Sequence, residues 1–451
     1  MIILSLHLAT LLGGVLMVLL SADILRARRP PSATWGWLLF MLTLPWLAIP
    51  LYLSFGTRKL MPAARHLKTD NGVTVDSAHE TAVQRVLACN NIPPAQGGNR
   101  TRFHADGEDA LNALLSVIAS SQYRLDISIF LLANDVVGQR ILHEMLDAAL
   151  RGVEVRLLLD GVGSFLFSRR RLRALKAAGI HVAWFIPLLH RPFRGRTNLR
   201  NHRKLAIADG RRAWLGGRNM ADEYFANARR WIDLSFELEG PSVSQLAGVF
   251  AADWQFATRE QVPVATASES AGNGYVQVVR SGPDTPGEPL HDLLLSALFQ
   301  ARKRVLAVTP YFVPDESLQR ALCLAAMRGV RVTLIMPRRS NHRLADFTRS
   351  RYLRELWRAG VEIKLVAGPM VHAKGLVVDD SLALAGSANL DLRSLFLNFE
   401  LVCLFSSDAD VQALANWLGA LGRQAEDYRP APTGRLREVA EGVLLLLAYQ
   451  M

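Results

Sequence analysis

The chain has 451 residues, which is long enough for two ordinary domains and a tail. Its formal net charge of +12 suits any polyanion, nucleic acid or anionic lipid, and does not choose between them. Half of the residues are hydrophobic, so a membrane segment is expected. The three cysteines (Cys89, Cys323 and Cys403) lack metal-like spacing, which argues against a zinc site or a disulfide framework.

Two uncharged apolar runs, Ile2–Leu20 and Trp35–Phe55, stand near the N-terminus. Each has about the ~20 residues needed to cross the hydrocarbon core of a bilayer. The first run lacks a basic start and a small-residue cleavage site, which disfavours a cleaved signal peptide. We therefore expect residues 1–60 to form a two-span membrane anchor. Pro45 and Pro50 would kink the second span or turn it into a shallow hairpin. Basic residues flank this span on both sides, so its orientation stays open.

A polar stretch with Asn, Pro and Gly residues predicts a linker over residues 61–100. A pattern of helices and strands then occurs twice. In the first unit we expect helices at Ala110–Ser120 and Gly138–Leu150, a further helix ending at Ala177, and strands at Leu125–Phe130, Val153–Leu159 and Ile180–Ile186. In the second we expect helices at Pro289–Arg302, Leu318–Met327 and Leu353–Arg358, and strands at Val305–Val308, Val330–Ile335 and Val361–Leu365.

This alternation predicts an α/β fold with a mostly parallel sheet covered on both faces. Two matched units suggest a pseudo-twofold pair of domains, 101–262 and 263–451, with one site at their interface. The small and polar residues of Gln261–Gly274 indicate the linker between them.

The pattern His-x-Lys-x-x-x-x-Asp occurs once in each unit and is followed by a small-residue turn and an asparagine. Both copies run 17 residues from His to Asn (219 − 202 and 389 − 372). The first copy comprises His202, Lys204, Asp209 and Asn219, and the second comprises His372, Lys374, Asp379 and Asn389.

Residues i and i+2 of a strand point to the same face, so each histidine and its lysine can reach one pocket. Lysine supplies positive charge to phosphate oxygens, and an asparagine amide adds neutral donors. A single copy is usually an ordinary, partly buried strand histidine. Two matching copies on a duplicated scaffold instead favour a phosphoryl-transfer enzyme in which two histidines divide the work.

These twin motifs resemble those of the phospholipase D superfamily, and their context is similar to bacterial cardiolipin synthases. The resemblance covers nearly the whole chain and rests on Asn198–Lys204, Gly216–Asn219, Asp222–Tyr224, Trp231–Asp233, Thr309–Pro314, Gly386–Ser394 and Asn398–Glu400. It departs from the family at Ile127–Phe130, where the family tends to carry tyrosines, and in a short linker after the anchor.

The resemblance implies two tandem pseudo-twofold phospholipase D-like domains, each with a mixed β-sheet flanked by helices, after two N-terminal transmembrane helices. It implies a multi-pass protein of the bacterial cell (inner) membrane. The implied reaction joins two phosphatidylglycerol molecules into cardiolipin and releases glycerol, through a phosphatidyl-histidine and without metal or cofactor. Nucleic acid is not an expected partner, and the oligomeric state stays open.

The resemblance also implies roles for the site residues. His202 is expected as the nucleophile and His372 as the acid and base, although pseudo-symmetry allows the reverse. Asp233 and Glu400 are expected to hold the second nitrogen of the histidines. The other expected residues are Lys204, Lys374, Asn219 and Asn389, which would hold the phosphoryl oxygens, and Asp209 and Asp379, which we rank lower because they are more often structural.

Several alternatives stay open. The donor or acceptor could differ, with phosphatidylethanolamine as donor or water as acceptor. A nuclease-type member fits the charge but has little need of an anchor, and complete motifs disfavour an inactive scaffold. The basic loop with His190, Arg191, Arg194, Arg196 and Arg200 is either a solvated surface loop or a lid that meets anionic headgroups. Val443–Leu447 is too short to span a bilayer and predicts a core helix or an interfacial one.

Overall fold

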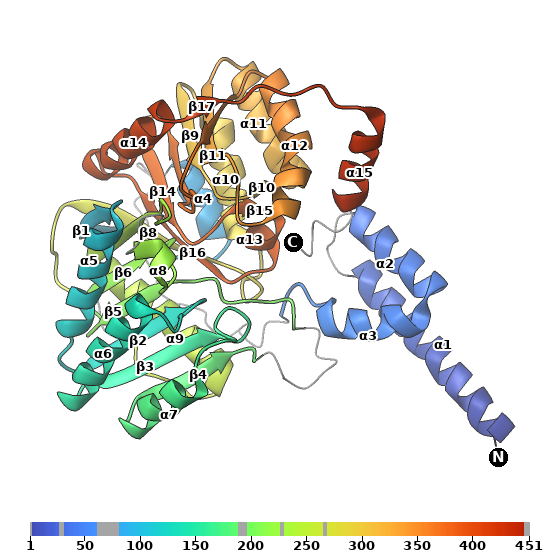
Figure 1. Ribbon diagram of the computed structural model, residues 1–451, viewed down its shortest axis with the longest axis horizontal. Helices are drawn as coiled ribbons and strands as arrows, with labels where there is room; N and C mark the ends of the chain where they lie inside the picture. Colours follow the sequence, from blue (N-terminus) through green and yellow to red (C-terminus); the bar gives the residue numbers. More distant parts are fainter. Residues whose placement is uncertain are drawn as a thin grey trace.

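The computed structural model describes residues 2–26, 31–60, 81–187, 196–225, 230–264 and 268–445. Figure 1 shows an α/β body from which the N-terminal helices project to one side. These helices are α1 (Ile2–Arg26), α2 (Pro31–Thr43) and α3 (Pro45–Phe55).

Fifteen strands of the described chain form one sheet, in which each half contributes strands in the same spatial order. The first half runs β1 (Gln96–His104), β7 (Ser235–Glu239), β6 (Arg212–Gly216), β5 (Leu205–Ala208), β2 (Arg124–Ile129), β3 (Glu154–Asp160) and β4 (His181–Phe185). The second runs β8 (Gly274–Ser281), β16 (Glu400–Phe405), β14 (Leu382–Gly386), β13 (Gly375–Val378), β9 (Arg304–Val308), β11 (Arg331–Pro337), β12 (Glu362–Val366) and β17 (Glu426–Asp427). Antiparallel pairing of β1 with β8 joins the halves.

The sheet is mixed, so the expectation of a mostly parallel sheet is wrong. Parallel pairing is confined to β2–β3–β4 and β9–β11–β12. The strands that follow the histidine motifs, β5–β6–β7 and β13–β14–β16, pair antiparallel. For β5–β6 and β13–β14 the reason is connection length, because strands joined by a short turn must run antiparallel, whereas parallel strands need a crossover helix.

Helices cover both faces of the sheet (Figure 1). In the first half they are α5 (Gly107–Ala119), α6 (Val136–Leu150), α7 (Arg169–Ala177), α8 (Asp222–Phe225) and α9 (Ser242–Thr258). In the second they are α10 (Pro289–Gln300), α11 (Glu316–Met327), α12 (Arg343–Arg358), α13 (Leu392–Phe396), α14 (Asp408–Arg423) and α15 (Arg435–Leu445). The short strands β10 (Phe312–Val313) and β15 (Leu390–Asp391) pair separately. Caps fix several helix starts, since Asp106, Asp135 and Asp315 each accept backbone N–H bonds from the first turn.

One of the apolar core clusters is shared by the two halves. It combines residues of α9 and α14 with strand residues from both sides of the β1–β8 junction, among them Phe236 and Phe405. The other two body clusters belong to one half each. Because the central cluster excludes water from the junction, the halves form one packed body and their equivalent edges face each other.

The structure bears on three expectations about the helices. The second apolar run is divided at Leu44, because Pro45 lacks the backbone N–H that would continue α2 and clashes with the preceding turn. Helix α12 begins at Arg343 and not at Leu353, its first half being arginine-rich and without a strong apolar signal. Within the described residues, no helix is both long and apolar enough to cross a membrane.

The expected linker 61–100 contains regular structure in its second part. Helix α4 (Ala82–Cys89) starts at a capping box in which Thr81 and Gln84 bond each other's backbone N–H. Its Val83 and Leu87 are buried in the core of the second half, against α10. Residues 61–80 lie outside the described residues. The prediction was wrong at this end because one short amphipathic helix leaves a weak pattern among polar neighbours.

The C-terminal apolar run Val443–Leu447 lies partly outside the described residues. Helix α15 packs on α12 through a polar contact, with the fully buried Glu441 paired to Arg354. Leu436 is 89% exposed and Val439 65% exposed. A helix that buries its glutamate and exposes these apolar side chains is not a core helix, and an interfacial position stays a prediction.

Candidate active site

Both His-x-Lys segments lie in extended chain just before a strand, and not inside it as expected. His202 and Lys204 precede β5, and His372 and Lys374 precede β13. The expected alternation still holds in the first copy. Arg203 turns away from the pocket, is 1% exposed, pairs with Asp253 and lies over the ring of Phe399. Each motif therefore presents its histidine and lysine together.

The backbone of each histidine is bonded to the other half of the molecule. The N–H of His202 donates to the carbonyl of Phe399 at 2.9 Å, and the N–H of His372 donates to the carbonyl of Ile232 at 2.7 Å. Phe399 directly precedes Glu400, and Ile232 directly precedes Asp233. Each half thus donates one backbone hydrogen bond to the other half across the pseudo-twofold axis. These hydrogen bonds place each histidine beside a carboxylate of the opposite half.

The side chains complete this exchange. Nδ1 of His202 lies 3.0 Å from Oε1 of Glu400, and Nδ1 of His372 lies 2.7 Å from Oδ2 of Asp233. Both carboxylates are fully buried. An ionised carboxylate can only accept, so the Nδ1 proton points at it and Nε2 is left for chemistry. Both carboxylates therefore occupy the position expected of them. Each one pairs with the histidine of the opposite half, which the spacing along the sequence does not reveal.

Neighbouring charges keep the two carboxylates ionised. Burial opposes ionisation of Asp233, but the charge of Lys374 and the interaction with His372 outweigh it and lower the pKa of Asp233 to about 2. For Glu400, burial acts in the same opposing direction, and the interaction with His202 lowers the pKa from its ordinary value. The site therefore contains two fixed negative charges, each matched by an imidazole and a lysine.

The imidazoles themselves are neutral near pH 7. Burial lowers the pKa of His202 to about 4, against an opposing effect of Glu400. Burial also lowers the pKa of His372 to about 3, and the charge of Lys374 adds to the shift. A neutral imidazole with a free Nε2 is a competent nucleophile or base. An anionic phosphodiester beside it would favour the protonated form and raise these pKa values.

Two buried lysines provide the positive charge. Nζ of Lys204 donates to the carbonyl of His202 at 2.6 Å, and Nζ of Lys374 lies 2.7 Å from Nδ1 and 3.1 Å from Nε2 of His372. Burial lowers the pKa of Lys374 to about 8 and that of Lys204 well below its ordinary value. The pKa values of these lysines are lowered because burial removes water from the charged ammonium groups. A bound anion would stabilise the ammonium groups in place of that water, which makes the pocket selective for negative charge.

The two asparagines lie in the same buried region. Nδ2 of Asn219 donates to the hydroxyl of Tyr224 at 2.9 Å, and Nδ2 of Asn389 donates to Oδ2 of Asp391 at 3.0 Å. These residues are 4% and 7% exposed, respectively. Their expected role as donors to phosphoryl oxygens stays a prediction.

The turns before the asparagines differ between the halves. A Cβ atom on Gly217 would lie 2.2 Å from Oδ1 of Asp233, so only glycine fits beside that carboxylate. The equivalent position is Ser387, whose hydroxyl donates to Oε2 of Glu400. Asn398 adds a bond to Oε1 of Glu400 at 3.2 Å. Ser387 had no assigned role in the sequence interpretation, although its place in the turn offered the signal.

Asp209 and Asp379 do not reach the site. They lie after the far ends of β5 and β13, and both have a φ of 53°. The carboxylate of Asp209 accepts the backbone N–H groups of residues 122–124, and that of Asp379 accepts those of residues 302–304. Each aspartate therefore anchors the start of the neighbouring antiparallel strand, β2 for Asp209 and β9 for Asp379. The strand that follows each histidine separates the aspartate from it, so the structure does not bring Asp209 and Asp379 together with the histidine pair.

Aromatic rings flank both histidines. Phe130 lies 5.3 Å from His202, between ring centroids, and Tyr224 and Trp231 lie 5.1 Å and 5.4 Å from His372.

Of the basic loop, residues 188–195 lie outside the described residues. Arg200 is buried and donates to the carbonyl of Ile186 at 3.0 Å, which removes it from any headgroup-binding lid.

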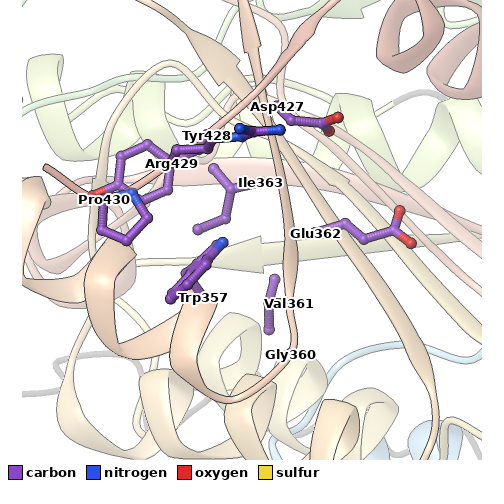
Figure 2. Close-up of a pocket in the computed structure, with 9 residues that line it drawn as sticks. All are labelled: Trp357, Gly360, Val361, Glu362, Ile363, Asp427, Tyr428, Arg429 and Pro430. Carbon is purple, nitrogen blue, oxygen red and sulfur yellow. The ribbon is translucent and has the colours of Figure 1, made fainter.

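A cavity of about 610 Å³ lies away from the histidines, where the end of α12 meets β12 and the edge strand β17 (Figure 2). Figure 2 shows Trp357 and Tyr428 on its wall with Glu362 and Asp427 at its rim. None of its lining residues belongs to either motif. The cavity is therefore separate from the histidine pair.

Comparison with known proteins is in agreement with the geometry. The family described as cardiolipin synthase, phospholipase D-like domain, matches residues 114–254 and 294–421, and a phospholipase D-nuclease N-terminal family matches residues 15–56. The chain belongs to the cardiolipin synthase family of phospholipase D-like proteins. It is 33% identical over 414 residues to Cardiolipin synthase A of Yersinia pseudotuberculosis and equally to that of Yersinia pestis, covering 85% of each chain.

A solved structure shares the fold. Phosphatidylserine synthase of Haemophilus influenzae superposes with a TM-score of 0.60 at 16% identity, covering 81% of this chain and 97% of that one. The tandem arrangement of two phospholipase D-like domains with a mixed sheet, implied by the sequence resemblance, is therefore confirmed.

Proposed function

We propose that the protein is a cardiolipin synthase that transfers a phosphatidyl group from one phosphatidylglycerol to another and releases glycerol. The observation that carries this proposal is the crossed pair His202–Glu400 and His372–Asp233, with two buried lysines between them. Family membership and the curated relatives named Cardiolipin synthase A support the choice of reaction. The same pair also suits a phosphatidyl transfer with another donor or acceptor. The reaction products distinguish these alternatives from cardiolipin synthesis.

In the first step, Nε2 of His202 attacks phosphorus and the phosphorus–oxygen bond to glycerol breaks. His372, protonated beside the bound anion, donates its Nε2 proton to the leaving oxygen. In the second step, His372 removes a proton from a hydroxyl of the second phosphatidylglycerol. That oxygen attacks phosphorus, the phosphorus–nitrogen bond breaks and His202 is restored. Lys204, Lys374, Asn219 and Asn389 would hold the phosphoryl oxygens while charge develops on them.

The assignment of His202 as nucleophile follows the family resemblance, and one feature of the site supports it. Asp233 lies closer to its histidine, at 2.7 Å, than Glu400 does to His202, at 3.0 Å. Glu400 also accepts bonds from Ser387 and Asn398, which draws part of its charge away from His202. A less shared carboxylate favours the imidazolium form of His372. The charge of Lys374 acts against that form, so the assignment of roles rests mainly on the family resemblance.

We also propose that the N-terminal helices anchor the enzyme in the cell membrane as a multi-pass protein. The uncharged sequence run Ile2–Leu20 and the match of residues 15–56 to a phospholipase D-nuclease N-terminal family support this. Membrane fractionation with alkaline carbonate washing tests it. The full chain should stay in the pellet, and release by carbonate would contradict the anchor.

The reaction is tested with purified full-length protein in vesicles of phosphatidylglycerol. Mass spectrometry should find cardiolipin and glycerol in equal amounts, with neither formed by the His202→Ala variant. Phosphatidic acid as main product would indicate water as the acceptor. A requirement for phosphatidylethanolamine, with release of ethanolamine, would replace the donor. Cleavage of DNA without any lipid product would overturn the proposal in favour of a nuclease.

A further inference from the structure

The chain leaving α3 lies directly against the catalytic body. Nζ of Lys59 donates to the carbonyls of Gly282 at 2.9 Å and Gly287 at 2.6 Å, and lies 2.9 Å from Oε2 of Glu288. Three contacts to fixed oxygens match the three protons of an ammonium group. Lys59 is therefore held in one place on the loop between β8 and α10, which we call the 282–288 loop.

The neighbours of Lys59 bind the same surface. A guanidinium nitrogen of Arg58 lies 3.1 Å from Oε1 of Glu288, and its guanidinium carbon lies 4.4 Å from the ring centre of Phe396 on α13. The N–H of Leu60 donates to the carbonyl of Pro283 at 2.9 Å. The side chains of Arg58 and Glu288 are 14% and 24% exposed. This partial burial and the bonds to backbone distinguish the contact from a solvated surface ion pair.

The 282–288 loop in turn supports the active site. A Cβ atom on Gly282 would lie 3.0 Å from Cα of Phe399 and 3.1 Å from the carbonyl oxygen of Asn398, so the loop backbone rests on this segment. The carbonyl of Phe399 binds the N–H of His202, and Asn398 binds Glu400. The 282–288 loop, which binds Lys59, therefore packs against the segment 398–400 that positions His202 and contains Glu400.

A second connection joins the anchor to the other side of that histidine. The N–H of Thr197 donates to the carbonyl of Ser54, in the last turn of α3, at 3.1 Å. Thr197 precedes His202 by five residues (202 − 197). Both segments that lead to the His202–Glu400 pair are thus tied to the C-terminal end of α3, within the stretch Ser54–Leu60. The active site lies beside the point where the chain leaves the last helix of the anchor.

We propose that Arg58 and Lys59 form a latch, a contact that fixes the active site in one orientation against the end of the membrane anchor. In that orientation the active site faces the phosphodiesters of lipids in the bilayer. This inference rests on the proposed function, because it assigns these residues to the delivery of a membrane-bound substrate. A body on a free tether would present its site to the bilayer in only a fraction of its orientations. A latched body has that orientation fixed before binding, which removes an entropic cost from each encounter.

The test compares Lys59→Met with wild type on two forms of phosphatidylglycerol, long-chain lipid in vesicles and dihexanoyl lipid dispersed as monomers. Both use full-length protein reconstituted in vesicles that otherwise contain only phosphatidylcholine, with glycerol release as the readout. We expect kcat/KM on vesicle lipid to fall about tenfold, while the value on monomeric lipid stays within about twofold, because misorientation affects only a substrate fixed in the bilayer. Lys59→Arg, which keeps the charge and several donors, should recover much of the lost activity.

Lys303→Met is the matched control, since it also removes one lysine charge. Lys303 lies 3.2 Å from Asp380, and its side chain is 74% exposed. This variant should match wild type on both substrates. An equal loss on both substrates in Lys59→Met would overturn the latch and make Lys59 a support of the site alone. No loss on either substrate would also overturn it.

A measurement without turnover separates this inference from the proposed function. Hydrogen–deuterium exchange should become faster in the 282–288 loop of Lys59→Met and stay unchanged in Lys303→Met. Unchanged exchange in both variants would overturn the latch whatever the activity. If the wild-type protein released no glycerol from either lipid, the proposed function would fail, and the exchange experiment would still decide whether the contact exists.

Discussion

The two halves of the molecule hold their histidines by one backbone scheme and surround them with different side chains. Each histidine N–H bonds to the residue before the opposite carboxylate. His202 meets Phe130 and a glutamate that is shared with two further donors. His372 lies against Tyr224 and Trp231, beside an aspartate that fits only because Gly217 has no side chain.

This difference shows where duplicated units can diverge. The backbone bridges depend on the sheet order, which both halves share, and cannot change without breaking the fold. The side chains around each imidazole are independent of that order. A symmetric scaffold can therefore assign two different tasks, attack on phosphorus and proton transfer, by altering only the local carboxylate and its neighbours.

The largest expected effect comes from removing either histidine. His202→Ala and His372→Ala should each lower kcat by a factor of about 10⁴ or more, because each performs a step that the other cannot supply. Under acid-free denaturing conditions, a phosphatidyl adduct should map to His202. His372→Asn should prolong its life with an activated donor, since nothing then deprotonates the incoming hydroxyl. An adduct on His372 in the wild-type chain would exchange the two roles.

Neutral isosteres of the carboxylates should have the next largest effect. We expect Glu400→Gln and Asp233→Asn to lower kcat by about 10²- to 10⁴-fold, because an amide does not fix the tautomer or stabilise the imidazolium. The crossed pairing is checked by double mutants. Adding Glu400→Gln to His202→Ala should cost little more than His202→Ala alone, since the carboxylate acts through that histidine. Full additivity of the two losses would contradict the pairing.

Gly217 and Ser387 should respond differently to substitution. Gly217→Ala should reduce kcat about 10²-fold, because its Cβ would displace the carboxylate of Asp233 from 2.2 Å away. Ser387→Gly should cost only about five- to tenfold, since it removes one hydrogen bond to Glu400. Steady-state kinetics with circular dichroism to verify folding measures both. Equal effects would mean that the turns are interchangeable.

The pH dependence should reveal the buried state of the site. A protonated imidazole cannot attack phosphorus, and the pKa of His202 is lowered to about 4, so the acid limb of activity should lie well below the ordinary imidazole value. The pKa of Lys374 is lowered to about 8, so its charge and the activity should decline as pH rises through about 8. Profiles of kcat should shift toward higher pH, because bound anion favours protonation. An acid limb near the ordinary imidazole value would contradict burial of His202.

The smallest effect on catalysis is expected at the motif aspartates. Asp209→Asn and Asp379→Asn should leave kcat within about twofold of wild type while lowering stability by about 1–3 kcal/mol, since each accepts backbone N–H groups that would lose a charged partner. Thermal unfolding with kinetics below the transition tests this. A loss of kcat comparable to that of Asp233→Asn would return these residues to the active site.

The sequence by itself determined the duplicated α/β order, the two motif copies and the two histidine–lysine pairs that the structure brings together. This information is local or repeated, because strands, caps and the His-x-Lys alternation depend on neighbouring residues. It also contained Asp233 and Glu400 as candidate partners for the histidines.

Only the tertiary structure decided which carboxylate meets which histidine, that Asp209 and Asp379 support strands, and that α4 belongs to the core of the second half. The reason is that sequence spacing measures separation along the chain. Bridges across a pseudo-twofold axis join residues as far apart as His202 and Glu400, and such contacts exist only once both halves share one sheet and one apolar core.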